Sequence, residues 1–226
     1  PAATLSDDSI PNPLAFPNDT IEYFVNATDT NNCSSADSVT LVVNPLPIAD
    51  AGADKEICLG DSTPLSATGG TTFTWTPGLT LSDDSVFNPF AFPADTTTYF
   101  VSVTDFKNCN NTDSVTVIVN PLPIVLASND TSICKNGTAP LNATGGISYL
   151  WTPATFLDNP NIQNPQATPD DTIKYFVTAT DSNTCNGIDS VTIIVNQLPN
   201  ADAGEDAWLC PGDSAQLIAT GGTGFN

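Results

Sequence analysis

The chain has 226 residues, 40% of them hydrophobic, and carries 25 acidic residues against four lysines, with no arginine and no histidine. A formal net charge of -21 excludes nucleic acid and anionic lipid as expected partners, because both require clusters of Lys or Arg. The 19 prolines and 14 glycines predict many short strands joined by turns, so an all-β fold with packed cores is expected.

The sequence repeats with a period of 76 residues, which Trp75 and Trp151 both keep. A Val-Asn-Pro-Leu-Pro linker stands at 43–47 and 119–123, and Val-Asn-Gln-Leu-Pro follows at 195–199. Paired prolines favour a stiff, extended connector, so we place the domain boundaries there. The chain then comprises the C-terminal part of an immunoglobulin-like repeat (1–47), two complete repeats (48–123 and 124–199) and the N-terminal part of another (200–226).

Within residues 48–123, apolar side chains alternate with period two, as in half-buried strands. We expect a first strand near 53–57, strands around 65–67, 73–75, 99–103 and 115–119, and one or two short strands between 81 and 92. About seven strands per repeat predict a tandem array of immunoglobulin-like β-sandwiches. The third strand would bury Trp75, and Trp151 in the next repeat, while Tyr23, Tyr99 and Tyr175 would head the sixth strand, as in a tyrosine corner.

Four segments together resemble a known family. They are Ala-Asp-Ala-Gly-Ala-Asp at 49–54, Ile-Cys-Leu-Gly-Asp-Ser at 57–62, Leu-Ser-Ala-Thr-Gly-Gly at 65–70, and Tyr-Phe-Val-Ser-Val-Thr-Asp at 99–105 before Cys109. The chain is similar along its whole length to the PKD-type and immunoglobulin-like repeats of giant surface proteins of Bacteroidota. That resemblance implies PKD-like sandwich domains of a gliding-motility adhesin or another protein exported by type IX secretion. Similar modules also separate catalytic domains in surface hydrolases.

The residue inventory argues against an enzyme, and we expect no cofactor. Without histidine, the Ser-His, Cys-His and His-rich zinc arrangements cannot form, and without arginine there is no bidentate clamp for carboxylate or phosphate. Neighbouring acids in an extended segment point to opposite faces and make a poor acid–base pair. Asp83, Asp84, Asp170 and Asp171 are weak calcium candidates, because these acidic turns lack the spaced Asp-x-Asp-x-Asp-Gly pattern.

The six cysteines form two series with the 76-residue period and suit disulfides in an oxidising compartment. The simplest pairing joins Cys58 to Cys109 and Cys134 to Cys185, and closing each loop of about 51 residues would contribute about 4 kcal/mol in the chain-entropy model. Cys33 and Cys210 would then pair outside the chain or with a neighbouring chain. The alternative is a bridge between neighbouring repeats, from Cys58 to Cys185, because the two cysteines of one sandwich are expected at its opposite ends.

A second modification is suggested by Asp-Ser or Asp-Thr followed by an apolar residue or Thr, which resembles the O-glycosylation signal of Bacteroidota. Because Asp, Ser and Thr are also ordinary turn residues, a purely structural role stays open. The candidate sites are Ser9, Thr20, Ser38, Ser62, Ser85, Thr96, Ser114, Thr172, Ser190 and Ser214.

The leading hypothesis is a structural or adhesive repeat segment of a long extracellular bacterial protein or filament, such as a stalk, adhesin or gliding-related fibre. Its partners would be neighbouring repeats, other copies of itself, surface glycans or substrata, with no membrane insertion within this segment. One alternative is a spacer in a multidomain secreted hydrolase. Another is a small subunit that polymerises when residues 200–226 of one chain complete the domain begun by residues 1–47 of the next.

Overall fold

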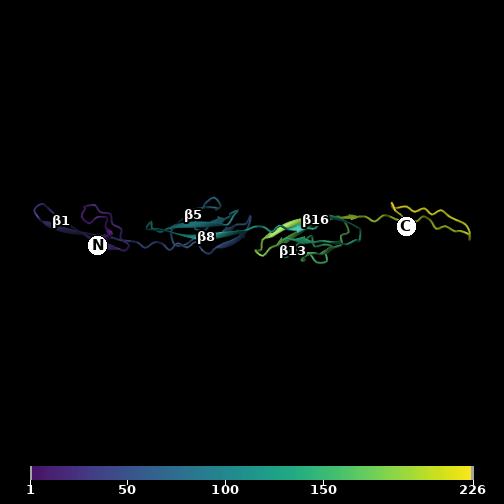
Figure 1. Cartoon of the computed structure of the whole chain (residues 1–226), viewed down its shortest axis with the longest axis horizontal. Coiled ribbons are helices and arrows are strands. Elements are labelled where there is room, and N and C mark those ends of the chain that lie inside the picture. Colours follow the sequence, from purple (N-terminus) through teal and green to yellow (C-terminus); the bar gives the residue numbers. More distant parts are fainter. Residues whose placement is uncertain (1, 225–226) are drawn as a thin grey trace. The chain divides into compact units, whose positions relative to one another are not determined.

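The computed structural model describes residues 2–224 and shows strands, turns and one short 3-10 helix (Ala2–Thr4) over that range. The expected all-β, immunoglobulin-like fold is confirmed. The chain divides into two compact units, with the boundary between Val119 and Asn120, inside the second predicted linker. Each unit contains one complete repeat, marked by β5 and β8 in the first and by β13 and β16 in the second (Figure 1).

The repeat of the first unit has two layers. One layer is a four-stranded sheet in the order β3 (Lys55–Cys58), β8 (Asn110–Asn120), β7 (Thr97–Thr104) and β5 (Thr72–Thr76). The other layer pairs β4 (Thr63–Pro64) with β6 (Phe90–Ala91). It continues irregularly where Leu65 N donates to Pro89 O at 2.8 Å, because proline cannot extend a regular ladder.

The repeat of the second unit is built in the same way. Its four-stranded sheet has the order β10 (Thr131–Cys134), β16 (Asn186–Asn196), β15 (Ile173–Thr180) and β13 (Ser148–Thr152), with β10 parallel to β16. Opposite it, β11 (Ala139–Pro140) pairs with β14 (Gln166–Ala167), and β9 (Leu126–Ala127) pairs with β12 (Ala143–Thr144). The β9–β12 ladder corresponds to the single bridge between Asp50 and Thr68 in the first repeat. The complete repeats therefore have six and eight named strands, where the sequence predicted about seven.

The two incomplete repeats keep parts of this pattern. Residues 2–47 contain the antiparallel hairpin of β1 (Ile21–Thr28) and β2 (Ser34–Leu41) and a bridge between Leu5 and Ala15. Residues 200–224 contain the bridge between Asp202 and Thr220 but no named strand. Neither part has a second layer to cover its apolar side chains, so most of the large ones are exposed, although Tyr23 is buried.

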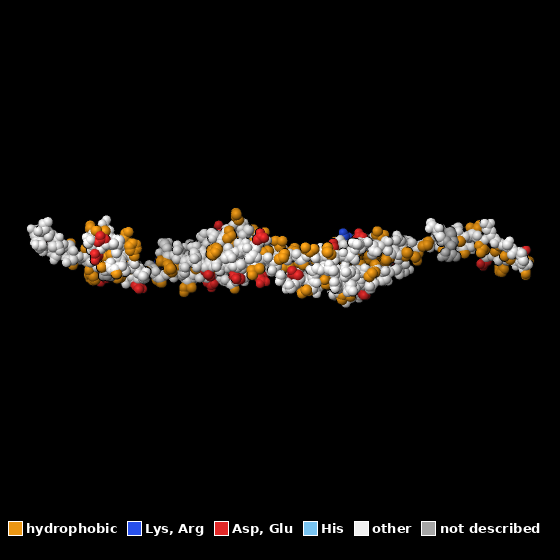
Figure 2. Space-filling view, in the orientation of Figure 1, with side chains coloured by type: hydrophobic (Ala, Val, Ile, Leu, Met, Phe, Trp, Pro, Cys, Tyr) orange, Lys and Arg blue, Asp and Glu red, His pale blue; other side chains and the backbone are white. Residues whose placement is uncertain are grey.

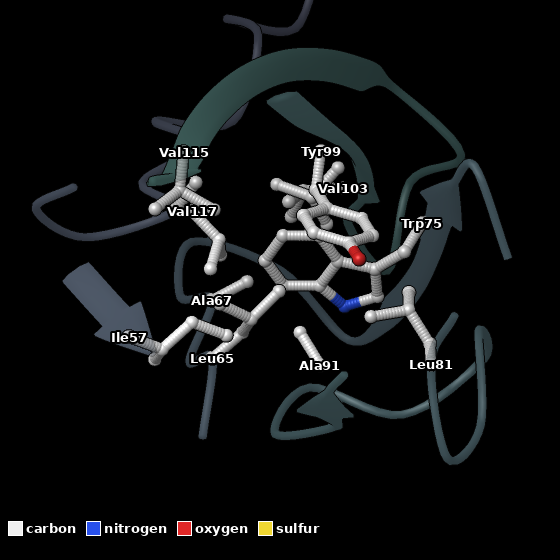
Figure 3. Packing of buried hydrophobic residues seen from close by; sticks show 12 residues of the cluster. Ile57, Leu65, Ala67, Trp75, Leu81, Ala91, Tyr99, Val103, Val115 and Val117 are labelled. Atoms are coloured by element: carbon white, nitrogen blue, oxygen red, sulfur yellow. The ribbon is translucent and has the colours of Figure 1, made fainter. Parts of the chain in front are cut away.

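The core of each complete repeat is apolar and centred on a tryptophan. Figure 3 shows Trp75 from β5 between residues of the four-stranded sheet, such as Tyr99 and Val115, and residues of the opposite layer, such as Leu65 and Ala91. Trp75 and Trp151 have no exposed surface. Each indole nitrogen donates to a backbone carbonyl, Val86 O at 2.9 Å and Ile162 O at 3.0 Å. The polar edge of each indole is thereby satisfied, and its large apolar area stays out of water.

Candidate functional site

The interior of the described chain is built from apolar residues. Across residues 2–224, no buried polar or charged residue occurs, and no buried side-chain nitrogen or oxygen lacks a hydrogen-bond partner. No group of three or more Cys, Asp or Glu residues in this range is arranged to hold a metal ion.

Two of the four calcium candidates can be described by their hydrogen bonds. Asp83 Oδ1 accepts bonds from Ser85 N at 2.8 Å and Ser85 Oγ at 2.6 Å, and these lower the pKa of Asp83, the hydroxyl bond most strongly. The adjacent Asp84 instead contributes its carbonyl oxygen, which accepts from Trp75 N at 2.8 Å. Asp170 and Asp171 are exposed on the turn that precedes β15. The bonds of Asp83 and Asp84 give these two aspartates a structural role in their turn.

The tyrosines that recur with the repeat do not make the bond expected of a tyrosine corner, in which the hydroxyl bonds to backbone a few residues upstream. The Tyr99 hydroxyl lies 2.6 Å from Thr80 Oγ1, and the Tyr23 hydroxyl lies 2.5 Å from Thr4 Oγ1. Tyr175 donates to Thr155 O at 2.9 Å, and burial raises its pKa. In the complete repeats the tyrosine therefore fixes the loop that follows the core tryptophan. The sequence, interpreted as a tyrosine corner, did not predict this role.

An aspartate latch holds the start of each complete repeat against its last strand. Asp113 Oδ2 accepts a bond from Ala51 N, and Asp189 Oδ2 accepts one from Ala127 N, both at 2.8 Å. Backbone amides, first that of Ala51 and then that of Ser114, lower the pKa of Asp113. The sequence showed only an Asp-Ser dipeptide here, and the signal for a latch was its recurrence with the repeat.

A second aspartate strengthens this latch from the other side. Asp54 Oδ1 accepts a bond from Thr116 N at 2.8 Å, and Asp130 Oδ1 accepts one from Thr192 N at 2.7 Å. The first segment of a repeat and its last strand thus exchange aspartate–amide bonds in both directions. In an incomplete repeat one side of each exchange is missing.

The cysteines differ in state. Cys58 and Cys185 are disulfide-bonded, whereas Cys33, Cys109, Cys134 and Cys210 are free thiols. The expected pairing within each repeat, of Cys58 with Cys109 and of Cys134 with Cys185, is therefore wrong, because one partner of each pair is free. The physical reason is that the two cysteines of one repeat lie at opposite ends of its longest strand.

The glycosylation candidates are accessible. Nine of the ten are exposed, and Ser190 is half-buried. Several of their hydroxyls already have structural partners: Thr96 Oγ1 accepts from Val119 N, and Thr172 Oγ1 accepts from Val195 N, both at 3.1 Å. These threonines fix the last strand of each repeat at its end, which gives the Asp-Thr dipeptide a role in the fold beside any modification.

A hollow of about 520 Å³ opens in the N-terminal incomplete repeat, over the hairpin β1–β2. Leu5, Ile10, Tyr23, Val25 and Val39 are among the residues that line it. Val25 and Val39 are 61% and 60% exposed, whereas the corresponding Val101 and Val115 are 0% and 1% exposed. The hollow is therefore the place that the first half of a repeat occupies in a complete sandwich.

The surface shown in Figure 2 carries scattered red acidic side chains and very little blue over both complete repeats. Orange apolar groups lie between them, as is normal for a protein surface. Within residues 2–224 no helix is long and apolar enough to cross a membrane.

Comparisons with known proteins give distant likenesses. No protein-family profile matches the chain. The mouse dyslexia-associated protein KIAA0319-like protein is 30% identical over 159 residues, a match that covers 58% of this chain and 15% of the mouse protein. The chain thus spans only a small share of the length of that relative.

Searches of solved structures give partial likenesses at low sequence identity. The insect immune protein hemolin is 13% identical, with 77% of this chain and 56% of hemolin covered and a TM-score of 0.38. A Ca2+-stabilized adhesin that helps an Antarctic bacterium bind ice is 11% identical, with 82% and 60% covered and a TM-score of 0.39. The immunoglobulin domains 1–5 of Sidekick-1 are 12% identical, with 82% and 47% covered and a TM-score of 0.32.

Proposed function

We propose that this chain is a structural and adhesive segment of a long extracellular protein on a bacterial surface, and that its repeats do no catalysis. The observation that carries the proposal is the tandem repetition of one sandwich with an apolar core, stiff proline linkers and no buried polar group among residues 2–224. Such modules set distance and bear tension between the ends of a protein, while any binding is done by surface loops.

The resemblance to Bacteroidota surface repeats supports a finer proposal, a gliding-motility or related adhesin exported by type IX secretion and decorated with O-glycans. The acidic surface suits such a place, because a net charge of -21 keeps the protein soluble and suppresses non-specific association. Self-association, surface glycans or solid substrata would be the partners. As spacer modules in a secreted hydrolase, the same repeats would hold a catalytic domain away from the cell.

The test is the mass and location of the native polypeptide in the source cells. An antibody against residues 48–199 should label intact cells, and the boiled, reduced protein should run at several hundred kilodaltons as one covalent array. A native band near 23.5 kDa, allowing for glycans, or labelling only after lysis, contradicts the long surface array.

A second candidate function is a subunit that polymerises by domain complementation, and the hollow over β1–β2 favours it. The exposed Leu217 corresponds to Leu65 and Leu141, which are 1% exposed in the complete repeats. Residues 200–224 therefore carry the apolar side chains that the hollow lacks. The latch is complementary too: Ala203 corresponds to Ala51 and would donate to Asp37, which corresponds to Asp113. Growth of the sedimenting mass with protein concentration tests this function.

A further inference from the structure

The two cysteines of a repeat lie at its two opposite ends. We call the end at which the chain arrives from the preceding linker the leading end, and the other the trailing end. Cys134, the last residue of β10, pairs in register with Asn196, the last residue of β16, and Lys135 N donates to Asn196 O at 2.8 Å. Because the chain leaves the repeat after Asn196, Cys134 lies at the trailing end.

Cys185 lies at the leading end of the same repeat. It stands in the turn between β15 and β16, directly before Asn186, where β16 begins. The start of β16 touches the incoming linker, since a Cβ built on Gly187, two residues after Cys185, would lie 2.2 Å from Pro123 O. The 11-residue strand β16 separates the two ends by about 33 Å at the usual rise per residue. A disulfide requires Cα atoms within about 7 Å, so Cys134 and Cys185 cannot bond each other.

The first repeat has the same arrangement. Cys58 ends β3, which lies beside β8 as β10 lies beside β16. Cys109 stands in the turn before β8, and the neighbouring Asn111 Nδ2 donates to Pro47 O of the incoming linker at 3.0 Å. Each repeat therefore presents its first cysteine at the trailing end and its second at the leading end.

The turn that carries the second cysteine is held in place by an aspartate. Asp181 Oδ1 accepts bonds from Asn183 N and Cys185 N, each at 2.9 Å. Asp105 makes the same two bonds in the first repeat, to Lys107 N at 2.8 Å and Cys109 N at 2.9 Å. The second cysteine of each repeat thus lies on a turn that is already fixed. Less conformational entropy is therefore lost when it forms a disulfide.

We propose that Cys58 and Cys185 are bonded to each other across the linker 119–123, and that this bond recurs along an array. Each repeat's first cysteine would then bond the second cysteine of the following repeat. All six cysteines are described, four are free, and only Cys58 and Cys185 are bonded. They are also the only first and second cysteines in the 226 residues that belong to consecutive repeats in that order.

The same rule accounts for the free thiols. Cys33 and Cys109 are second cysteines and need a first cysteine one repeat earlier, whereas Cys134 and Cys210 are first cysteines and need a second cysteine one repeat later. No residue of this sequence meets those needs. Forming each bond removes two protons and two electrons from two thiols, and the electrons pass to the disulfide of an extracytoplasmic thiol oxidant, which becomes a dithiol. A series of such bonds would cross-link each repeat to the next across every linker. This inference does not depend on whether the repeats are adhesive.

Tryptic mapping of the oxidised 226-residue chain tests the pairing. After free thiols are blocked under denaturing conditions, cleavage at the four lysines gives peptides 1–55, 56–107, 108–135, 136–174 and 175–226. We expect four thiols to be blocked before reduction and six after it, and peptide 56–107 to be linked to 175–226 in a chain that runs as a monomer without reductant. Peptide 108–135 linked to either of the other two, or a link found only in a dimer band, overturns the proposal.

Two serine variants assign the bond within peptide 175–226, which contains both Cys185 and Cys210. Cys185→Ser should abolish the link to peptide 56–107, and Cys210→Ser, at an exposed position, should leave it intact. Because Cys185 is fully buried and its loss could unfold the turn, Cys58→Ser provides an independent test at a half-buried position. In this variant the Cys185 thiol should be blocked under denaturing conditions before any reduction, and retention of a bonded Cys185 would overturn the pairing.

Discussion

At the scale of single residues, aspartate is the side chain that recurs as the hydrogen-bond acceptor holding turns and strands in place. The same side chain closes turns at Asp83 and Asp105, latches the repeat at Asp113, and fixes the turn of the second cysteine at Asp181. Each of these carboxylates accepts a backbone amide, so it supplies a hydrogen-bond acceptor to an N–H group of the turn or strand that it holds. The acidic composition is therefore partly a consequence of the fold and is more than a solvated surface.

The latch at Asp113 makes stability depend on pH. Its pKa is lowered in the folded chain, so its contribution is complete above the unfolded value of about 3.8 and is lost as the pH falls toward the folded pKa. Asp113→Asn should lower stability at pH 7 by about 1 kcal/mol, allowing for solvent screening, and this difference should shrink below pH 4. Thermal unfolding of both chains between pH 2.5 and 7 measures it.

Asp37→Asn is the matched control for this experiment. Asp37 occupies the corresponding position in the incomplete repeat, and its Oδ1 accepts only the adjacent Ser38 N at 2.8 Å among the bonds found. Stability should not change with this substitution at protein concentrations low enough to keep the chain monomeric, where no second copy supplies Ala203 to Asp37. An equal effect of both substitutions, or a difference at Asp113 that does not depend on pH, would show that the latch bond is not its cause.

At the scale of elements, each repeat is closed by a glycine pair packed on the incoming strand. Gly69, Gly145 and Gly221 have φ between +90° and +104°, which L-residues avoid, and a Cβ on any of them would lie within 2.1 Å of a carbonyl oxygen of the incoming segment. The Gly-Gly pairs of the sequence predicted turns here, but a turn alone does not require this close approach.

Gly69→Ala should therefore destabilise the first repeat by about 3 kcal/mol or more, through backbone strain and a clash with Ile48 O. Gly60→Ala is the control, because Gly60 has a φ of +95° but no heavy atom within 4 Å of its built Cβ. It should cost only the strain, about 1 kcal/mol. Chemical denaturation of both variants separates the cost of backbone strain from the cost of the clash. Equal losses of unfolding free energy in the two variants would mean that packing on Ile48 contributes nothing.

At the scale of the whole molecule, the two incomplete repeats present complementary apolar faces. A second copy that supplied residues 200–224 would cover Val25 and Val39 as the first half of a complete repeat covers Val101 and Val115. Thr40 N would also gain Asp206 as an acceptor, as Thr116 N has Asp54. Buried apolar area and restored latch bonds both favour association of copies.

Adjacent residues of β1 provide a matched pair of variants. Val25 corresponds to the buried Val101, and Phe24 corresponds to Phe100, which stays 54% exposed in the complete repeat. In sedimentation velocity, the average mass of the wild-type chain should rise above 23.5 kDa as the protein concentration increases. The average mass of the Phe24→Asp variant should rise in the same way. Val25→Asp should remain monomeric. A wild-type chain that stays monomeric at every concentration, or equal behaviour of the two variants, would contradict complementation.

The sequence by itself determined the class of fold, because the alternation of Val101 and Val103 with polar neighbours and the position of Trp75 are local patterns. It also predicted the repeat, since recurrence of cysteine, tryptophan and proline needs no knowledge of contacts. The tertiary structure alone decided the state of the cysteines, the partner of each tyrosine hydroxyl and the latch of Asp113 to Ala51. These features join residues about 20 to 60 positions apart, or depend on which end of a strand a residue occupies. Sequence periodicity and spacing do not specify which distant segments pack together, so they could not predict these contacts.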